Sequence, residues 1–370
     1  MLWYTLTGGM VELVERFCSG ALETECENMQ AIIFCQNIKS FVVGISSKSA
    51  VRFFPHLLSL CIAVLMMTVL VLKPVFAQES TSSTAASGEE SVLPLRSEVA
   101  QLDGLQIEYV VHRVQNARAT IVFENGLMLD LKTWQAVVNR LADCCNLFLY
   151  NRPGIGRSTF VDTKSEPRHA TARLQRILQE RGLSQPYLLV GHSLGGQYAQ
   201  AFATQYPEQV NGLLLVDALP LGVMKPAEEF PWYTRLGLWA FASKAAREEI
   251  ANVHPMGEAV MEPSNYFSKP MIRILAISEP DKKKSQGLIR NLLRGVVYAE
   301  DFGVWAIDPD QAESRMNSFY PQAEIRHVQA HHRVQEHLPQ TVVDAIKTLI
   351  DKQESLLASA SDKAHGAARQ

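Results

Sequence analysis

The sequence predicts an α/β fold with a mostly parallel central sheet and helices on both faces. Short apolar runs bounded by turn residues alternate with amphipathic helical patterns between residues 95 and 355, as in chains whose helices connect parallel strands. Several runs, such as 147–150 (LFLY) and 187–190 (YLLV), are apolar on both faces, which suits strands buried within a parallel sheet. Hydrophobic residues make up 47% of the chain, enough for a large core.

Seven segments have the β-branched, aromatic and apolar character of strands. They are 107–114, 120–123, 147–150, 187–190, 213–216, 272–277 and 323–328. Four segments instead repeat apolar residues at helical spacing. They are 131–141, 169–181, 197–205 and 341–357.

The stretch from about 219 to 269 interrupts this alternation between two core strands. It is mostly helical in pattern and rich in aromatic residues, among them Phe230, Trp232 and Trp239. Two interpretations stay open: a helical cap over a pocket, or an ordinary amphipathic packing layer. The segment 282–320 is a candidate for a second, partial cover.

The first 77 residues predict an export or anchoring segment. The uncharged run 57–72 (LLSLCIAVLMMTVLVL) follows Lys48 and Arg52 and precedes Val75-Phe76-Ala77, the pattern of a signal peptide cleaved after Ala77. Sixteen residues are short for a membrane span of about 20, so an uncleaved anchor and a buried core helix are the alternatives. The first two interpretations place the rest of the chain outside the cytoplasm, secreted, periplasmic or associated with a membrane through 57–72.

The remaining segments complete the predicted organisation. Residues 1–46 carry no recognised motif, and one hypothesis is that the true start lies downstream, at Met29. Residues 78–94 are rich in Ser, Thr, Ala and Glu and read as a linker. The Ala- and Ser-rich residues 356–370 are expected to form a flexible tail. One domain at 95–355 therefore accounts for the core.

Composition argues against several classes of function. The net charge of -3 and pI of about 6.4 give no basic face for nucleic acid, and six cysteines are too few for a disulfide scaffold. A dinucleotide fingerprint starting at Gly154 would need glycine where Thr159 stands. The histidine-rich run 327–337 begins in a predicted strand, whereas ligands four residues apart share a face only on a helix. We therefore expect no cofactor and no metal.

The sharpest motif is Gly191-His192-Ser193-Leu194-Gly195, between the run 187–190 and the helical pattern 197–205. A turn this tight from strand to helix requires flanking residues without side chains, and it holds the serine strained with Oγ exposed. The free N–H groups at the start of the following helix stabilise developing negative charge. The motif therefore predicts Ser193 as a nucleophile, with Gly191 and Gly195 as the glycines of the turn.

With this motif, residues 95–352 resemble the α/β-hydrolase fold superfamily (serine-nucleophile hydrolases of the AB hydrolase-1 type). The segment Glu124-Asn125-Gly126-Leu127 stands where the family carries a His-Gly motif, with asparagine in place of the histidine. The resemblance implies an oxyanion hole made by the backbone N–H groups of Leu127 and Leu194. The segment 151–158 (NRPGIGRS) is similar to the family's Asp-x-x-Gly-x-Gly-x-Ser loop, with asparagine first.

The resemblance also implies a catalytic histidine and acid. His332 is preferred over His331 because Glu336 and Pro339 follow it by four and seven residues, a spacing common in the family. The segment 278–281 (SEPD) is similar to the family's Gly-x-x-Asp turn, which implies Asp281 as the acid. Glu279 is an alternative, as is Asp217, since some members take their acid from near the end of the preceding strand.

The expected function is that of a serine hydrolase, which cleaves a carboxylic ester through an acyl-enzyme. Its substrate would be a small molecule with an apolar acyl or alcohol part. Relatives that open epoxides or remove halogens carry aspartate at the position of Ser193, which argues against those activities. Hydrolysis of an amide, peptide or C–C bond with the same triad stays open, as does a non-catalytic binding protein of the same fold.

Overall fold

The computed structural model describes residues 95–102, 104–160, 167–262, 267–277 and 302–367. The predicted signal peptide or anchor at 57–72, the linker 78–94 and the acid candidates Glu279 and Asp281 lie outside these residues. Within the described part of the chain, no helix is both long enough and apolar enough to cross a membrane.

The structure is built on an eight-stranded sheet in the order β1-β2-β4-β3-β5-β6-β7-β8. The first two pairs in this order are antiparallel and the others are parallel. The strands are β1 (Glu98–Leu102), β2 (Leu105–His112), β3 (Ala119–Glu124), β4 (Cys145–Tyr150), β5 (Tyr187–His192), β6 (Val210–Val216), β7 (Met271–Ala276) and β8 (Glu324–Val328). All seven predicted strands are confirmed as β2 to β8. The edge strand β1 was not expected from its sequence, because only Ala100 and Leu102 of its residues are buried.

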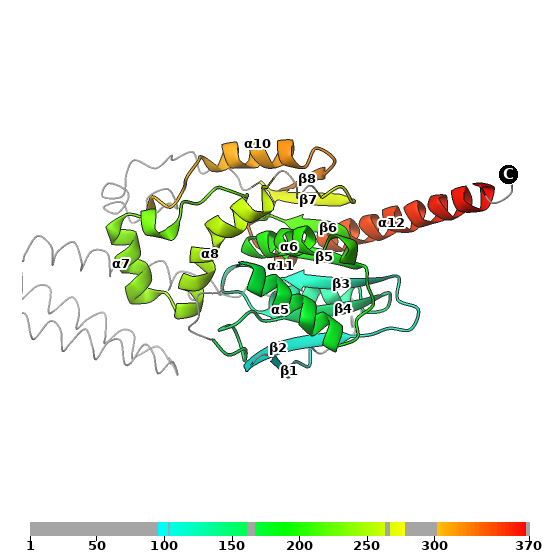
Figure 1. Cartoon of the computed structure of the whole chain (residues 1–370), viewed down its shortest axis with the longest axis horizontal. Helices are drawn as coiled ribbons and strands as arrows, with labels where there is room; N and C mark the ends of the chain where they lie inside the picture. The colour runs from blue at the N-terminus through cyan, green and yellow to red at the C-terminus, as the bar shows by residue number, and fades with distance from the viewer. Residues whose placement is uncertain (1–94, 103, 161–166, 263–266, 278–301, 368–370) are drawn as a thin grey trace, which may run out of the picture. The chain divides into compact units, whose positions relative to one another are not determined.

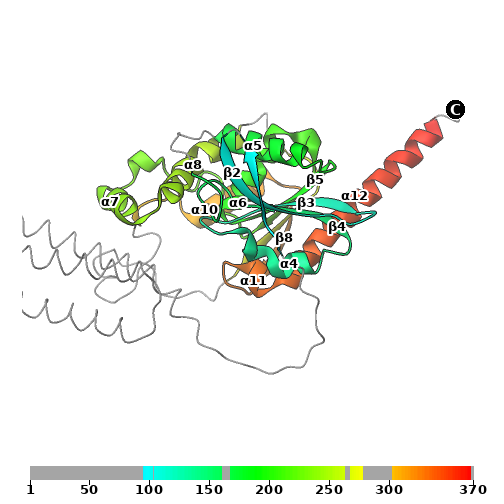
Figure 2. The same ribbon diagram turned by 90° about the horizontal axis from the view of Figure 1, so that it is seen from below.

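Helices cover both faces of this sheet, as a parallel sheet requires (Figures 1 and 2). Alternate residues of a strand face opposite layers: in β5, Leu189 joins one core cluster while Leu188 and Val190 join the other. One cluster includes buried residues of α5 (Pro167–Glu180) and α6 (Leu194–Gln205). The other includes residues of η1 (Leu131–Trp134), α4 (Gln135–Asn139), α11 (Val334–His337) and α12 (Pro339–Ala367).

The insertion between β6 and β7 is mostly helical, as its sequence predicts. It contains η3 (Ala227–Glu229), α7 (Trp232–Phe241) and α8 (Lys244–Val260). The helices α7 and α8 lie toward the carboxyl end of β3 (Figure 1). The two helices differ, because α8 packs into the core shared with α6, whereas Trp232 and Trp239 of α7 are 63% and 71% exposed. In α8 the insertion is a packing layer, whereas a cap over a pocket stays a prediction.

The described part of 282–320 also lies against this insertion. Met224 and Trp305 form an antiparallel bridge, and the N–H groups of Lys225 and Ala306 donate to Val304 and Val223 across it. The helix α10 (Pro309–Phe319) follows and buries Ala312 and Met316 in the core cluster of α6 and α8.

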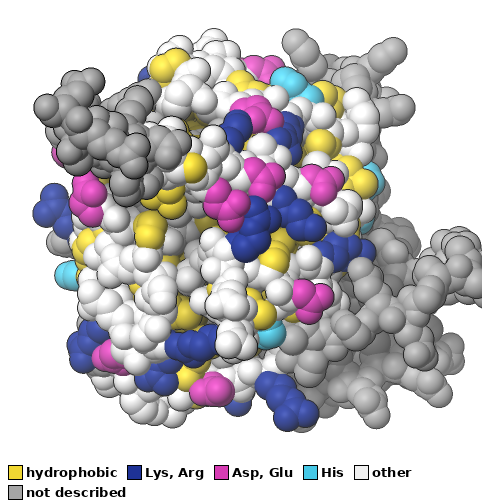
Figure 3. Space-filling view, turned by 90° about the vertical axis from the view of Figure 1, so that its right-hand side faces the viewer, with side chains coloured by type: hydrophobic (Ala, Val, Ile, Leu, Met, Phe, Trp, Pro, Cys, Tyr) yellow, Lys and Arg dark blue, Asp and Glu magenta, His cyan; other side chains and the backbone are white. Residues whose placement is uncertain are grey.

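The C-terminal residues differ from the expected flexible tail. Helix α12 continues through Ala367, because the Ala, Leu and Lys residues of this segment favour helix. Leu356 and Leu357 of this helix are exposed. On the face shown in Figure 3, basic and acidic side chains are interspersed rather than gathered by sign, in keeping with the small net charge of the sequence.

Candidate active site

Ser193 occupies the turn between β5 and α6 in a conformation that side chains rarely adopt. Its φ is 52° and its ψ is -123°, a strained backbone of the kind that clusters at functional sites. The turn is held to the end of β6, since the Ser193 N–H donates to Val216 O at 3.2 Å and Ser193 O accepts from the Leu219 N–H at 3.0 Å. This is the strand-to-helix turn that the glycine-rich motif predicts.

The glycines of the motif are required by close backbone packing. A Cβ on Gly191 would lie 2.6 Å from Gly195 O, and a Cβ on Gly195 would overlap the carbonyl oxygens of Glu124 and Asn125. A Cβ on Gly126 would lie 2.8 Å from His192 Nδ1. The start of α6 and the segment after β3 therefore touch without intervening side chains.

His332 lies on the loop between β8 and α11 and contacts both Ser193 and Asp217. Its Nε2 is 2.9 Å from Ser193 Oγ, and its Nδ1 is 2.6 Å from Asp217 Oδ2. A carboxylate only accepts hydrogen bonds, so Nδ1–H donates to Asp217 and Nε2 is left to accept the Ser193 hydroxyl proton. The alternative histidine, His331, instead packs its ring against His337 with 5.4 Å between centroids.

Asp217 follows β6 and is fixed by the neighbouring strand β7. Its N–H donates to Ile274 O at 2.7 Å, its Oδ1 accepts from the Ala276 N–H at 2.9 Å, and its φ is 44°. These contacts aim Oδ2 at His332. Among the acid candidates from the sequence, Asp217 is therefore the one that the described structure brings to His332, while Asp281 and Glu279 lie outside the described residues.

His192 supports the histidine loop and was not singled out by the sequence. Its Nε2–H donates to His332 O at 2.9 Å, and the two rings lie 4.7 Å apart. Burial, with a smaller contribution from His332, lowers the pKa of His192 to about 4, so this ring stays neutral at physiological pH. Its position directly before Ser193 is the signal that could have identified it.

The two expected oxyanion donors lie on the segments that meet beside Ser193. Leu194 is the first residue of α6, so its N–H has no acceptor within the helix. After β3, the Met128 N–H donates to Glu249 Oε2 at 3.1 Å and the Leu129 N–H to Gly126 O at 3.2 Å. The Leu127 N–H, which precedes these two, donates to no acceptor among the described residues.

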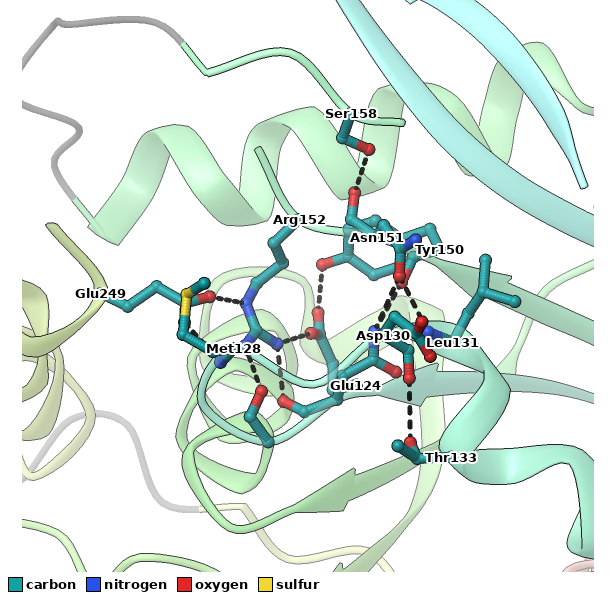
Figure 4. A network of polar contacts seen from close by, with 12 residues as sticks. Glu124, Met128, Asp130, Leu131, Thr133, Tyr150, Asn151, Arg152, Ser158 and Glu249 are labelled. Atoms are coloured by element: carbon teal, nitrogen blue, oxygen red, sulfur yellow. Dashed lines mark hydrogen bonds and ion pairs between the residues drawn. The ribbon is translucent and has the colours of Figure 1, made fainter. Parts of the chain in front are cut away.

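A buried network of ion pairs and hydrogen bonds, centred on Arg152, contacts the segment after β3 (Figure 4). Arg152 Nε donates to Glu249 Oε1 at 2.6 Å, and Arg152 Nη1 lies 3.3 Å from Glu124 Oε2. Its guanidinium also donates to the carbonyls of Asn125, at 2.6 Å, and Gly126, at 2.8 Å. Burial raises the pKa of Glu124 to about 7, although Arg152 acts in the opposite direction. The sequence did not assign roles to Arg152, Glu124 or Glu249.

The two asparagines that replace family residues are buried parts of the scaffold. Asn125 accepts from Trp134 Nε1 at 3.0 Å and donates to Tyr150 O at 2.8 Å. Asn151 accepts from the Leu131 N–H and donates to Glu108, both at 2.8 Å. These bonds tie the loop 151–158 to the segment after β3.

A cavity lies beside the ionic network rather than at Ser193. It is lined by residues of α5, α6 and α8 and of the loop after β4, including Tyr150, Arg152, Tyr198 and Glu249; neither Ser193 nor His332 borders it. The contacts of Ser193, and not this cavity, therefore define the candidate site. Among the described residues, no group of three His, Cys, Asp or Glu side chains is arranged to hold a metal ion.

Comparisons with known proteins point to one fold. Residues 119–247 match the family model described as alpha/beta hydrolase fold. The chain is 32% identical over 116 residues to the Caenorhabditis elegans "Abhydrolase domain-containing protein abhd-5.2", covering 30% of this chain and 26% of that protein. It is 32% identical over 100 residues to a Yersinia enterocolitica "Pimeloyl-[acyl-carrier protein] methyl ester esterase", covering 27% of this chain and 36% of the esterase.

The solved structure of Cfl2 from Burkholderia cenocepacia matches with a TM-score of 0.50 and 18% identity, covering 69% of this chain and 95% of Cfl2. At this identity the likeness shows the fold alone. The matched segments span less than half the length of the curated relatives.

Proposed function

Because the chain belongs to the α/β-hydrolase fold superfamily, we propose that it is a serine hydrolase of carboxylic esters. Ser193, His332 and Asp217 would form its catalytic triad. The observation that carries this proposal is the position of His332, whose two ring nitrogens lie 2.9 Å from Ser193 Oγ and 2.6 Å from Asp217 Oδ2. A non-catalytic relative would have no need to keep this continuous chain of contacts.

The proposed reaction follows from the roles of these atoms. His332 Nε2 takes the proton of Ser193 Oγ as the oxygen attacks the ester carbonyl, and Asp217 stabilises the imidazolium that forms. The N–H groups of Leu127 and Leu194 hold the oxyanion of the tetrahedral intermediate. His332 then protonates the departing alcohol, and water activated by the same nitrogen hydrolyses the acyl-enzyme.

The choice of an ester rests on the named relative from Yersinia enterocolitica, a methyl ester esterase. Ester cleavage also asks less of the leaving group than amide cleavage, because an alkoxide departs more readily than an amine anion. We therefore expect a small substrate with an apolar acyl or alcohol part, as the sequence suggests.

The nucleophile is tested with a fluorophosphonate probe, which reacts covalently with an activated serine. We expect wild type and the control Ser318→Ala, which removes an exposed serine of α10, to be labelled, and Ser193→Ala to be unlabelled. Equal labelling of Ser193→Ala would remove Ser193 as the nucleophile, and an unlabelled wild type would favour the non-catalytic alternative. A matched ester and anilide of one acyl group then separates esterase from amidase activity.

A further inference from the structure

Arg152 forms hydrogen bonds with two separate parts of the chain: residues 124–126, at the end of β3 and just after it, and the inserted helix α8. We propose that Arg152 and Glu249 are positioning residues, which hold the Leu127 N–H in the direction needed for an oxyanion hole. The working conformation of this segment would then depend on the seating of α8. The inference rests on the proposed function, because it concerns the stabilisation of an oxyanion formed at Ser193.

The first step is the peptide group between Gly126 and Leu127. Its carbonyl oxygen accepts from Arg152 Nη2 at 2.8 Å. In a planar trans peptide the C=O and the following N–H point in opposite directions. By holding Gly126 O on one side, Arg152 fixes the Leu127 N–H on the other. The preceding peptide is held in the same way, since Asn125 O accepts from Arg152 Nη1 at 2.6 Å.

The second step is the residue that follows. Met128 has a φ of 55°, which is unusual for a residue with a side chain. Its N–H donates to Glu249 Oε2 at 3.1 Å, while the other oxygen of the same carboxylate accepts from Arg152 Nε at 2.6 Å. Arg152 and Glu249 therefore hold the segment on both sides of Leu127.

The third step is burial, which makes these contacts difficult to replace. The side chains of Arg152 and Glu249 are 3% and 6% exposed, and a buried polar group that loses its partner costs free energy. The guanidinium also stacks on the Tyr198 ring of α6, 4.6 Å from its centroid. All these hydrogen bonds and the stacking on Tyr198 can form together only when the guanidinium occupies this one position.

The last step links the network to the inserted helix. Glu249 belongs to α8, which is anchored on α6 by a buried apolar side that includes Val253, Met256 and Val260. If α8 moves away, the carboxylate leaves with it, and both the Met128 N–H and Arg152 Nε lose their acceptor. The Leu127 N–H is therefore held in this orientation only while α8 is packed in this position.

The test is Glu249→Gln, compared with Glu258→Gln, which changes an exposed glutamate of the same helix. The amide has the shape of the carboxylate but only one acceptor oxygen, so it cannot accept from both Arg152 and Met128. We expect kcat for an ester to fall about 10- to 100-fold, somewhat less than the loss of a whole oxyanion donor, with KM changed less than about 2-fold. The Ki of a boronic acid, whose adduct with serine carries a tetrahedral oxygen, should rise in parallel. Glu258→Gln should match wild type.

The outcomes separate this inference from the proposed function. If wild type reacts with the fluorophosphonate and Glu249→Gln keeps kcat and boronic acid affinity, even with a lower melting temperature, the pair is only structural and the inference is overturned. If wild type does not react, the proposed function fails and the inference fails with it. If Glu249→Gln does not fold, Arg152→Lys is tested in the same way. One ammonium cannot replace the two separate donors to the two carbonyls, so we expect kcat to fall while KM changes little, and an unchanged kcat would overturn the inference.

Discussion

The two groups of residues next to Ser193 differ in their exposure to solvent and in the number of hydrogen bonds that join them. On one side, His332 and Asp217 have side chains that are 57% and 21% exposed, and they are joined by a single hydrogen bond. On the other side, Arg152, Glu124 and Glu249 are nearly buried and joined by several. Water can reach the first pair and replace a lost hydrogen bond, whereas loss of a partner in the second group leaves a buried polar or charged group unpaired. We therefore expect substitutions on the first side to affect catalysis most and those on the second to affect folding as well.

The largest effect is expected from Asp217→Asn, on the exposed side. The amide can still accept from the Ala276 N–H, but its NH2 would then face His332 Nδ1 and favour the wrong tautomer. Turnover should fall about 10⁴-fold, by analogy with other triads, while the melting temperature changes little. Steady-state kinetics measures this, with Asp281→Asn as the matched variant, and a larger loss for Asp281→Asn would make Asp281 the acid.

The next effect concerns stability on the buried side. Arg152→Met removes the buried positive charge that pairs with Glu124 and Glu249, and one donor from each of two backbone carbonyls, which should lower the free energy of unfolding by about 3–5 kcal/mol. Arg157→Met is the control, because Arg157 is 56% exposed where it pairs with Glu108, and such a pair contributes about 1 kcal/mol or less. Urea unfolding measures both, and equal losses would show that burial does not distinguish the two arginines.

The smallest expected effect is a pH dependence of the free energy of unfolding, in which two opposing contributions partly cancel in the wild type. Glu124 has a pKa of about 7 in the folded protein against an ordinary 4.5, so the folded state holds a proton that the unfolded chain releases. Its contribution to the free energy of unfolding falls as pH rises from about 4.5 to 7. His192 has a pKa of about 4 against an ordinary 6.5, so its contribution rises as pH rises from about 4 to 6.5. Between about pH 4.5 and 6.5 the two oppose each other.

Single variants should reveal each contribution. For Glu124→Gln we expect the free energy of unfolding to rise by about 1–3 kcal/mol between pH 4.5 and 6.5, while for His192→Gln it should fall over the same range. Urea unfolding at pH 4.5, 5.5 and 6.5 measures both slopes. Parallel curves for wild type and Glu124→Gln would mean that Glu124 does not retain its proton in the folded protein.

The candidate residues that stand in local sequence patterns could be predicted from the sequence. Ser193 stands in a five-residue motif, and His332 has a spacing to Pro339 that is read along the chain. The acid is harder, because Asp217 and Asp281 follow consecutive predicted strands whose carboxyl ends share one edge of the sheet. Spacing alone cannot choose between them. The contact with His332 depends on the turn at Asp217, where φ is 44°.

The buried network shows a different limit of sequence reasoning. Arg152 and Glu249 lie 97 residues apart, so no local pattern connects them. One signal was present: Glu249 stands at helical spacing with the apolar residues Val253, Met256 and Val260. A charge on the apolar side of a helix predicts a buried partner, although the identity of that partner comes only from the fold.

The tryptophans of this chain also provide optical reporters. Trp232 and Trp239 are two helical turns apart on α7 and largely in solvent, whereas Trp134 is fully buried and bonded to Asn125. Indole emission shifts to longer wavelength in water, and aqueous iodide quenches only accessible rings. With the two further tryptophans, Trp3 and Trp305, replaced by phenylalanine, red-edge, quenchable fluorescence would follow the inserted helix, while the blue, protected component would follow the segment beside Ser193. Without any attached dye, binding of a substrate analogue could be watched from both places at once.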